Sequence, residues 1–164
     1  MTVKANERVE IINTIKAQVG FRVPNSNIRK QFRGKYARTI MTFEDLEQAF
    51  YEPGVSYLFE TGILYIEDMA VKKRLGLEDE DATEPTKLIM ITDKEAKNLL
   101  DDATIKEFSD KVETLSGEQL RELAETAVDM EIDNMRKANI LQGATGIDVL
   151  RRIRDKRELK EDNK

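Results

Sequence analysis

Three helix start signals follow one another in the second half of the chain. Each pairs a Ser or Thr with a Glu or Gln three positions later: Thr92 with Glu95, Thr104 with Glu107, and Ser116 with Gln119. In such a capping box the two side chains satisfy backbone N–H groups that a helix leaves unpaired at its start. Because the signals recur every 12 residues or so, this half of the chain can hold only short helices, one after another.

Two further helices are expected towards the C-terminus. The first spans 134–142 and ends at Gly143, since glycine is common just after a helix. The second begins near Thr145 or Asp148, which can act as N-caps. We interpret the stretch between them as a helix–helix joint, and expect the charged end of the chain to fray.

The first half of the chain has a mixed pattern. Residues 8–13 and 19–23 are rich in β-branched side chains, and apolar residues alternate with others in 19–23, as in a half-buried strand. We predict that these two segments pair as a hairpin; the alternative is a helix over 7–18, whose apolar residues also fit a helical stripe. Residues 24–27 form a turn cluster, and 37–41 a further strand.

Short helices are also predicted in this half. Thr42 is an N-cap candidate, Pro53 can both end that helix and open the next one, and Asp68 can cap a third. Gly62 and Gly76 are the expected stops, and the apolar residues 63–66 form a strand.

The predicted fold class is therefore α+β, in two units. Residues 1–77 form a small β-rich N-terminal unit with short helices, and 87–164 form a multi-helix C-terminal unit. Between them, 78–86 is short, acidic and closed by Pro85, which is typical of a solvated linker.

The chain has no His and no Cys, and several common catalytic mechanisms depend on these residues. Serine or cysteine catalysis assisted by His is excluded, as is a structural zinc site. The glycines form neither of the common phosphate-binding motifs. The acidic run 78–81 lacks the glycine and spacing of an EF-hand, so we favour a solvated segment over a calcium site. Asp101 and Asp102 are adjacent and do not face each other, so we interpret them as surface acids.

Charge is unevenly distributed along the sequence. From Ile11 to Phe43 there are seven bases and no acid, residues 78–150 carry 19 acids and 8 bases, and the last 14 residues carry 7 bases and 4 acids. Such segregation indicates binding partners. The candidate contact residues are the bases of the two basic segments: Arg29, Lys30, Arg33, Lys35, Arg151, Arg152 and Arg154.

Aromatic residues are interleaved with the N-terminal bases, namely Phe21, Phe32 and Tyr36. Exposed aromatics among bases can stack on nucleobases, whereas aromatics at strand spacing usually belong to a core. Residues 1–77 carry 12 bases and 9 acids, a net charge of only +3. Binding that depends on counterion release needs a higher net positive charge, so nucleic acid is not the favoured partner.

Two regions carry a resemblance to a known class of proteins. The segment 38–77 contains TFEDL, PGV, LF, GIL and LGL in succession, and the C-terminal half adds AVDMEI and TGIDV. This arrangement resembles small proteins encoded in the structural modules of tailed bacteriophages that infect Gram-positive bacteria. The resemblance implies a non-enzymatic component of the virion or of its assembly, and it transfers no site residues.

These observations together predict a structural or interaction protein with no enzymatic activity and no cofactor. Its expected partners are copies of itself or a phage particle protein, in a virion assembled in the host cytoplasm. The alternative is a regulatory binder, either a nucleic-acid-associated protein or an acidic inhibitor of a host enzyme. Without a run of 18 apolar residues or the apolar core of a secretion signal at the N-terminus, no membrane association is expected.

Overall fold

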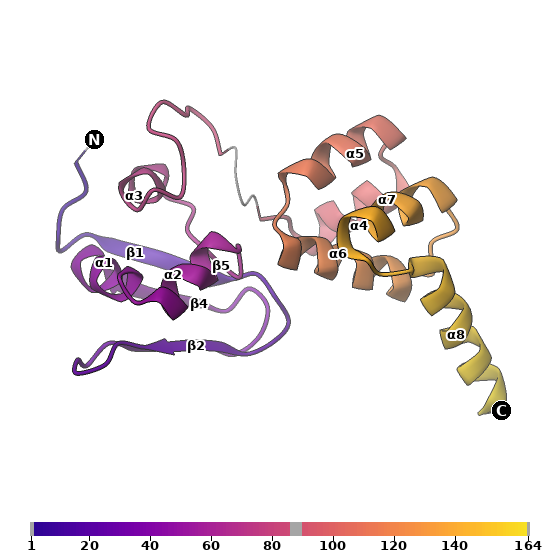
Figure 1. The fold of residues 1–164 in the computed structure, drawn as a ribbon, viewed down its shortest axis with the longest axis horizontal. Coiled ribbons are helices and arrows are strands. Elements are labelled where there is room, and N and C mark those ends of the chain that lie inside the picture. The colour runs from indigo at the N-terminus through magenta and orange to yellow at the C-terminus, as the bar shows by residue number, and fades with distance from the viewer. Residues whose placement is uncertain (1, 86–89, 164) are drawn as a thin grey trace. The chain divides into compact units, whose positions relative to one another are not determined.

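The structure is a computed structural model that describes residues 2–85 and 90–163 (Figure 1). The chain forms two compact units, Met1–Met90 and Ile91–Lys164. Strands and helices make up the first unit, and only helices are found among the described residues of the second. The α+β prediction is thus confirmed. Residues 86–89, where the predicted linker ends and the predicted helical unit begins, lie outside the described residues.

The strands of the N-terminal unit form two small antiparallel sheets. In the first, β1 (Arg8–Asn13) lies between β4 (Arg38–Thr42) and β5 (Leu64–Tyr65). In the second, β2 (Val19–Arg22) pairs with β3 (Arg29–Phe32). These pairings bear out the predicted strands, including the one at 37–41.

The predicted pairing of 8–13 with 19–23 is wrong, as is the alternative of a helix over 7–18, because β1 pairs with β4 and β5. One contact that fixes the observed arrangement comes from a buried asparagine at the end of β1. The Asn13 amide nitrogen donates to the carbonyl of Ala17, 2.9 Å away, and to that of Gly34, 2.8 Å away. Ala17 lies just before β2 and Gly34 just after β3. One side chain therefore ties both ends of the β2–β3 hairpin to β1.

Strand β3 was not predicted. It follows the turn at 24–27, but its inward positions hold Lys30 as well as Phe32, which conceals the alternation of a strand. Lys30 is accommodated there because its ammonium donates to the backbone carbonyl of Ile40 on β4, 3.1 Å away. The turn and the apolar residues Ile28 and Phe32 on either side of Lys30 were the available signal.

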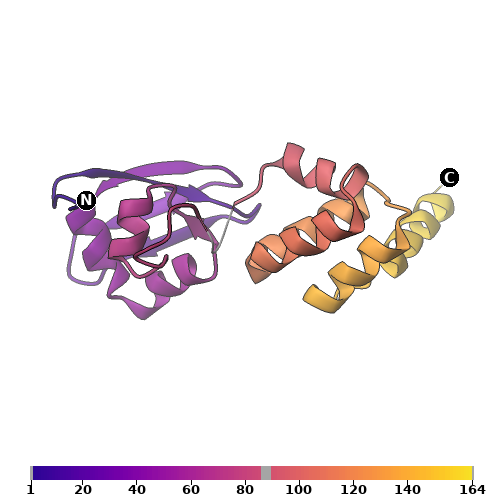
Figure 2. The ribbon, with the colours of Figure 1, turned by 90° about the horizontal axis from the view of Figure 1, so that it is seen from above.

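Three short helices complete the unit and lie on one side of the strands (Figure 2). They are α1 (Phe43–Phe50), α2 (Pro53–Glu60) and α3 (Met69–Arg74). Thr42 and Asp68 cap α1 and α3 by accepting backbone N–H bonds, as predicted, and Pro53 opens α2. Gly62 and Gly76 follow α2 and α3 with φ of 76° and 72°, a conformation that favours glycine.

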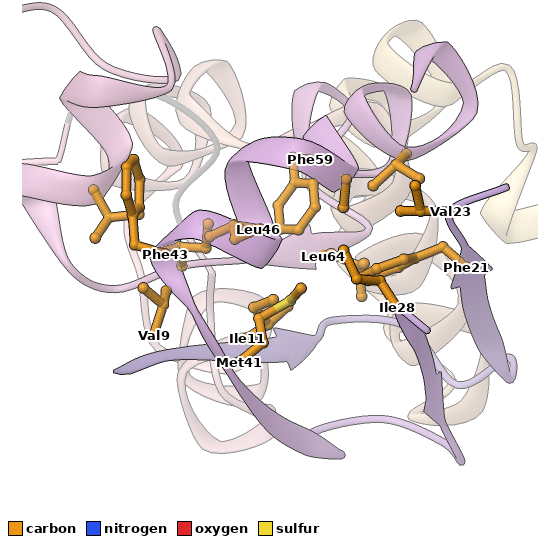
Figure 3. Close-up of a cluster of buried hydrophobic side chains, with 14 of the residues drawn as sticks. Val9, Ile11, Phe21, Val23, Ile28, Met41, Phe43, Leu46, Phe59 and Leu64 are labelled. Carbon is orange, nitrogen blue, oxygen red and sulfur yellow. The ribbon is translucent and has the colours of Figure 1, made fainter. Parts of the chain in front are cut away.

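Both sheets contribute to one hydrophobic core. Figure 3 shows side chains of the larger sheet lying beneath those of the short helices, while the hairpin residues Phe21, Val23 and Ile28 lie at one end of the same cluster. Leu46 and Phe59 are at most 1% exposed. The hairpin is consequently held by apolar packing on its inner face, by Asn13 at its base and by the bond of Lys30 to β4.

A buried ion pair fixes the start of the acidic segment that we expected to be solvated. The Glu78 side chain is fully buried, with its carboxylate 3.9 Å from the Lys72 ammonium. That ammonium also lies 4.8 Å from the centre of the Tyr65 ring. Burial lowers the pKa of Lys72, an effect that Glu78 partly offsets. Burial also raises the pKa of the Tyr65 hydroxyl, and the charges of Glu67 and Glu78 raise it further.

The C-terminal unit contains five helices within its described residues. A helix begins directly after each of the three predicted start signals. The helices are α4 (Asp93–Asp101), α5 (Ile105–Thr114), α6 (Gly117–Asp129), α7 (Met135–Thr145) and α8 (Val149–Asp162). The boxes at Thr92 and Thr104 are complete. Ser116 also caps its helix, but the Gln119 side chain is buried and makes no hydrogen bond within the part of the chain that the structure describes.

The predicted end of α7 at Gly143 is wrong, because the helix continues to Thr145. The Thr145 hydroxyl donates to the carbonyl of Leu141 and accepts the N–H of Ile147, which stabilises the additional turn. Gly146 supplies the left-handed residue, with φ of 75°. Asp148 then caps α8, which extends to Asp162 through residues that we expected to fray.

Lys137 on α7 is the most deeply buried charged residue among those described, with 1% exposure. Its ammonium donates to the carbonyls of Leu99 and Leu100, at 2.7 and 2.9 Å, and lies 5.5 Å from the Phe108 ring centre. The carbonyls at the end of α4 lack partners within their own helix, so Lys137 satisfies them from another helix and complements the helix dipole. The interaction ties α4, α5 and α7 together.

Replacing Asn13 by Leu, which has a similar volume, should destabilise the N-terminal unit. The substitution removes the side-chain donor of the Ala17 carbonyl, one of two donors of the Gly34 carbonyl and the acceptor of the Ile15 N–H, and we expect a loss of about 1–3 kcal/mol in the free energy of unfolding. Urea denaturation measures the loss. Asn27→Leu, at an exposed turn position, is the control and should change stability by less than about 0.5 kcal/mol. Equal effects of the two substitutions would contradict the role of Asn13.

Lys137→Met should destabilise the C-terminal unit by about 1–3 kcal/mol, since it removes the donor of two carbonyls at the end of α4 while keeping the apolar part of the side chain. Denaturation followed by circular dichroism, which reports mainly on helices, provides the measurement. Lys97→Met, an exposed change on α4, is the matched control. If the two variants unfold alike, the buried lysine contributes nothing beyond its hydrocarbon chain.

Candidate interaction surface on the N-terminal unit

The β2–β3 hairpin separates its side chains by chemistry. In the register of the two strands, Arg22 lies opposite Arg29, and Gly20 opposite Gln31; all four residues are exposed. The intervening apolar residues face the core. Arg33, also exposed, comes directly after β3. We call Gly20, Arg22, Arg29, Gln31 and Arg33 the outer hairpin face.

The three arginines of this face have no acidic partner among the described residues. Within residues 2–85 and 90–163, no carboxylate forms an ion pair with Arg22, Arg29 or Arg33. In contrast, Arg38 on β4 forms an ion pair with Glu10 on β1. The difference follows from the sequence, because the segment that builds the hairpin contains no acid.

Two of these arginines are held close together by the backbone. The N–H of Val23 donates to the carbonyl of Ile28 at 3.0 Å, so that these opposite residues form a hydrogen-bonded pair. In an antiparallel ladder the pair types alternate, which makes Arg22 and Arg29 a non-hydrogen-bonded pair. The Cβ atoms of such pairs lie about 4.5–5.5 Å apart, and like charges placed there are destabilising. The outer hairpin face therefore concentrates positive charge at a cost to stability.

Two of the four predicted N-terminal contact residues are exposed, and the other two are partly buried. Arg29 and Arg33 belong to the outer hairpin face, whereas Lys30 is partly buried and bonds to β4. Lys35 is also partly buried, with its ammonium 5.2 Å from the ring centre of Tyr36. Arg22 was not among the candidate residues, although the alternation over 19–23 had placed it on the exposed side of a strand.

The aromatic residues of the hairpin are not available to a ligand. Phe21 and Phe32 are 8% and 1% exposed, and their ring centres lie 6.5 Å apart within the core. The core interpretation is confirmed for Phe21 and Phe32, whereas Tyr36 is partly exposed and its ring lies beside the Lys35 ammonium. The outer hairpin face thus offers guanidinium groups and an amide, without a ring on which a base could stack.

The second predicted cluster is largely satisfied within its own unit. On α8, Arg152 lies 2.5 Å from Glu125 of α6 and Lys156 lies 3.2 Å from Asp129. Glu131 accepts from both Arg157 and Lys160, at 3.0 and 3.1 Å. These hydrogen bonds lower the pKa of Glu131. The predicted contact role of Arg152 is therefore weakened by this internal pairing.

The remaining two residues of that cluster, Arg151 and Arg154, are exposed. Among the described residues, neither side chain forms an ion pair. They sit on a helix whose other bases face α6, so the C-terminal cluster offers an external partner only part of the charge that the sequence indicated.

Other polar features of the described residues do not form a site. No three acidic side chains are placed to hold a metal ion in the ranges 2–85 and 90–163. Asp101 is the last residue of α4 and Asp102 its C-cap, both exposed. A cleft of about 1050 Å³ in the N-terminal unit is lined by charges of both signs, including the ion pair of Glu47 with Arg74 at 3.6 Å. This mixture favours no ligand class.

Comparison with protein-family models, with curated proteins and with solved structures gives no match. The resemblance to phage structural-module proteins accordingly stays a prediction. None of the helices within the described ranges combines the length and apolar character needed to cross a membrane.

Arg29→Thr should stabilise the N-terminal unit, by about 0.2–1 kcal/mol, because it relieves the repulsion with Arg22 and places a β-branched residue in a strand. The change is read from the urea midpoint. Arg38→Thr is the matched control on β4, where the arginine has an acidic partner, and it should give no gain. A destabilised Arg29→Thr variant would show that the arginine pair is not repulsive.

Proposed function

We propose that this chain is a non-enzymatic interaction protein that binds an acidic surface or segment of a partner protein through the outer hairpin face. The proposal depends on one observation: within the part of the chain that the structure describes, three exposed arginines have no acidic partner. Arginine is suited to this role because its planar guanidinium binds a carboxylate through two parallel hydrogen bonds. Repulsion between Arg22 and Arg29 is relieved when a carboxylate lies between them.

A protein partner is favoured over nucleic acid by the position of the aromatics. Binding of single-stranded nucleic acid combines bases with exposed rings on which nucleobases stack. Here Phe21 and Phe32 are buried, and Lys30 is engaged by β4. Three free arginines are few for binding that depends on the release of counterions from phosphates.

A virion or its assembly is the setting that we propose for this interaction. The support is the resemblance described above, together with the acidic composition of residues 78–150. That composition makes another copy of this chain one candidate partner, and a larger particle protein the other. In both cases complementary charge would guide association.

The experiment compares the binding of the full chain to polyglutamate and to double-stranded DNA at the same salt concentration, alongside its self-association by sedimentation. The test variant carries Arg22→Gln, Arg29→Gln and Arg33→Gln. The control carries Lys94→Gln, Lys97→Gln and Lys106→Gln, which removes the same charge from exposed positions of the helical unit.

We expect polyglutamate to bind the unmodified chain and the control alike, and the test variant at least about tenfold more weakly. Tighter binding to DNA than to polyglutamate would replace the proposal with the nucleic-acid alternative. A monomeric chain that binds neither polymer would overturn it.

A further inference from the structure

Strand β2 has a free edge. It pairs with β3 on one side only. Because Val23 and Ile28 form a hydrogen-bonded pair, the backbone groups of Phe21 point towards β3, and those of Gly20 and Arg22 point away from it. Within the described part of the chain, the backbone N–H and carbonyl groups of Gly20 and Arg22 have no other hydrogen-bond partner. Both residues are exposed.

Two devices that commonly keep an edge strand from pairing with another chain are not present in β2. These are a proline and a bulge within the strand. β2 contains no proline, and its ladder with β3 is regular. By comparison, β5 at one edge of the larger sheet has only two residues, and β4 at its other edge is contacted by Lys30.

Gly20 leaves the outer side of this edge unobstructed. A Cβ atom there would come within 3.1 Å of the Lys30 carbonyl oxygen, so the close pairing of β2 with β3 itself disfavours a side chain. An incoming strand would meet a bare backbone at Gly20 and a guanidinium at Arg22. Glycine in a strand often marks such a place of close backbone approach.

From these features we propose that β2 binds an extended acidic segment of another protein as an additional strand. The proposal rests on the proposed function and specifies its geometry. The backbone of the segment pairs with Gly20 and Arg22, and carboxylates at every second position lie on the same side of the sheet as Arg22 and Arg29.

The charge of the edge argues for a different chain as the occupant. If two copies of this protein paired through β2, the arginines of both hairpins would be brought together. The acidic segment of the chain itself begins with Glu78, which is buried against Lys72. A separate acidic segment has neither obstacle.

The experiment uses a short, terminally blocked peptide of alternating Glu and Val, with two backbone variants of the same charge. One is N-methylated at every Glu, and the other at every Val. An N-methyl group removes a donor and blocks pairing on one edge of the peptide. In an antiparallel addition the Glu residues bond to β2, and in a parallel addition the Val residues do. Each variant is therefore the control for the other.

We expect one N-methylated peptide to bind at least tenfold more weakly than the parent peptide, and the other to bind like it. Hydrogen exchange gives a second readout: the parent peptide should protect the amides of Gly20 and Arg22, while that of Phe21 is unchanged because it already bonds to β3.

Equal binding of all three peptides, or equal loss with both variants, would overturn strand addition. So would binding without protection of Gly20 and Arg22. The polyglutamate measurement separates the two proposals. If polyglutamate binds but the amides of Gly20 and Arg22 are not protected by the parent peptide, the outer hairpin face binds acidic partners by charge alone and strand addition is wrong. If the chain binds neither polyglutamate nor the parent peptide, both proposals fail.

Discussion

The N-terminal unit depends on a single amide group. Asn13 ends the central strand of the larger sheet, and its nitrogen holds the chain both where it enters the hairpin and where it leaves it. Without that donor the Ala17 carbonyl would lose this bond and the Gly34 carbonyl would lose one of its two. The hairpin would then be held by its apolar face and by the bond of Lys30 to β4. Lys137 has the corresponding role in the helical unit, where it joins the end of one helix to two others. In both units a side chain with two hydrogen bonds determines which elements meet.

The same alternation of residues produces the core and the outer hairpin face that we propose as a binding surface. One side of the hairpin contributes Phe21 and Phe32 to the interior, and the other presents Arg22 and Arg29. Since the first side is fixed by close packing, the arginines are displayed on a rigid support in spite of their repulsion. Such pre-organisation lowers the entropy lost when a partner binds.

Local sequence signals predicted most of the helix starts, whereas the strand pairings that depend on long-range contacts were not predicted. Thr42, Asp68, Thr92 and Thr104 cap helices as expected, because capping involves residues three or four positions apart. Strand partners are set by distant contacts, such as that of Asn13 with Gly34, which no local pattern reveals. For the proposed binding surface, charge along the sequence indicated the segment that carries the outer hairpin face. It could not show that Lys30 turns inward.

The second half of α8 is held to the rest of the helical unit mainly by ion pairs. In α8 the buried apolar residues Val149 and Ile153 lie in its first half. The second half is joined by Lys156, Arg157 and Lys160 to the end of α6 and the loop that follows it. Arg157 and Lys160 both bind Glu131, and these hydrogen bonds lower the pKa of its carboxyl from the ordinary value of 4.5. The two bonds are therefore fully formed above pH 4.5. They are lost as the pH falls through the lowered pKa of Glu131 in the folded state. Basic residues are also where trypsin-like proteases cut. A more acidic or more saline compartment would consequently expose this terminus to digestion, while the core of the helical unit stayed intact.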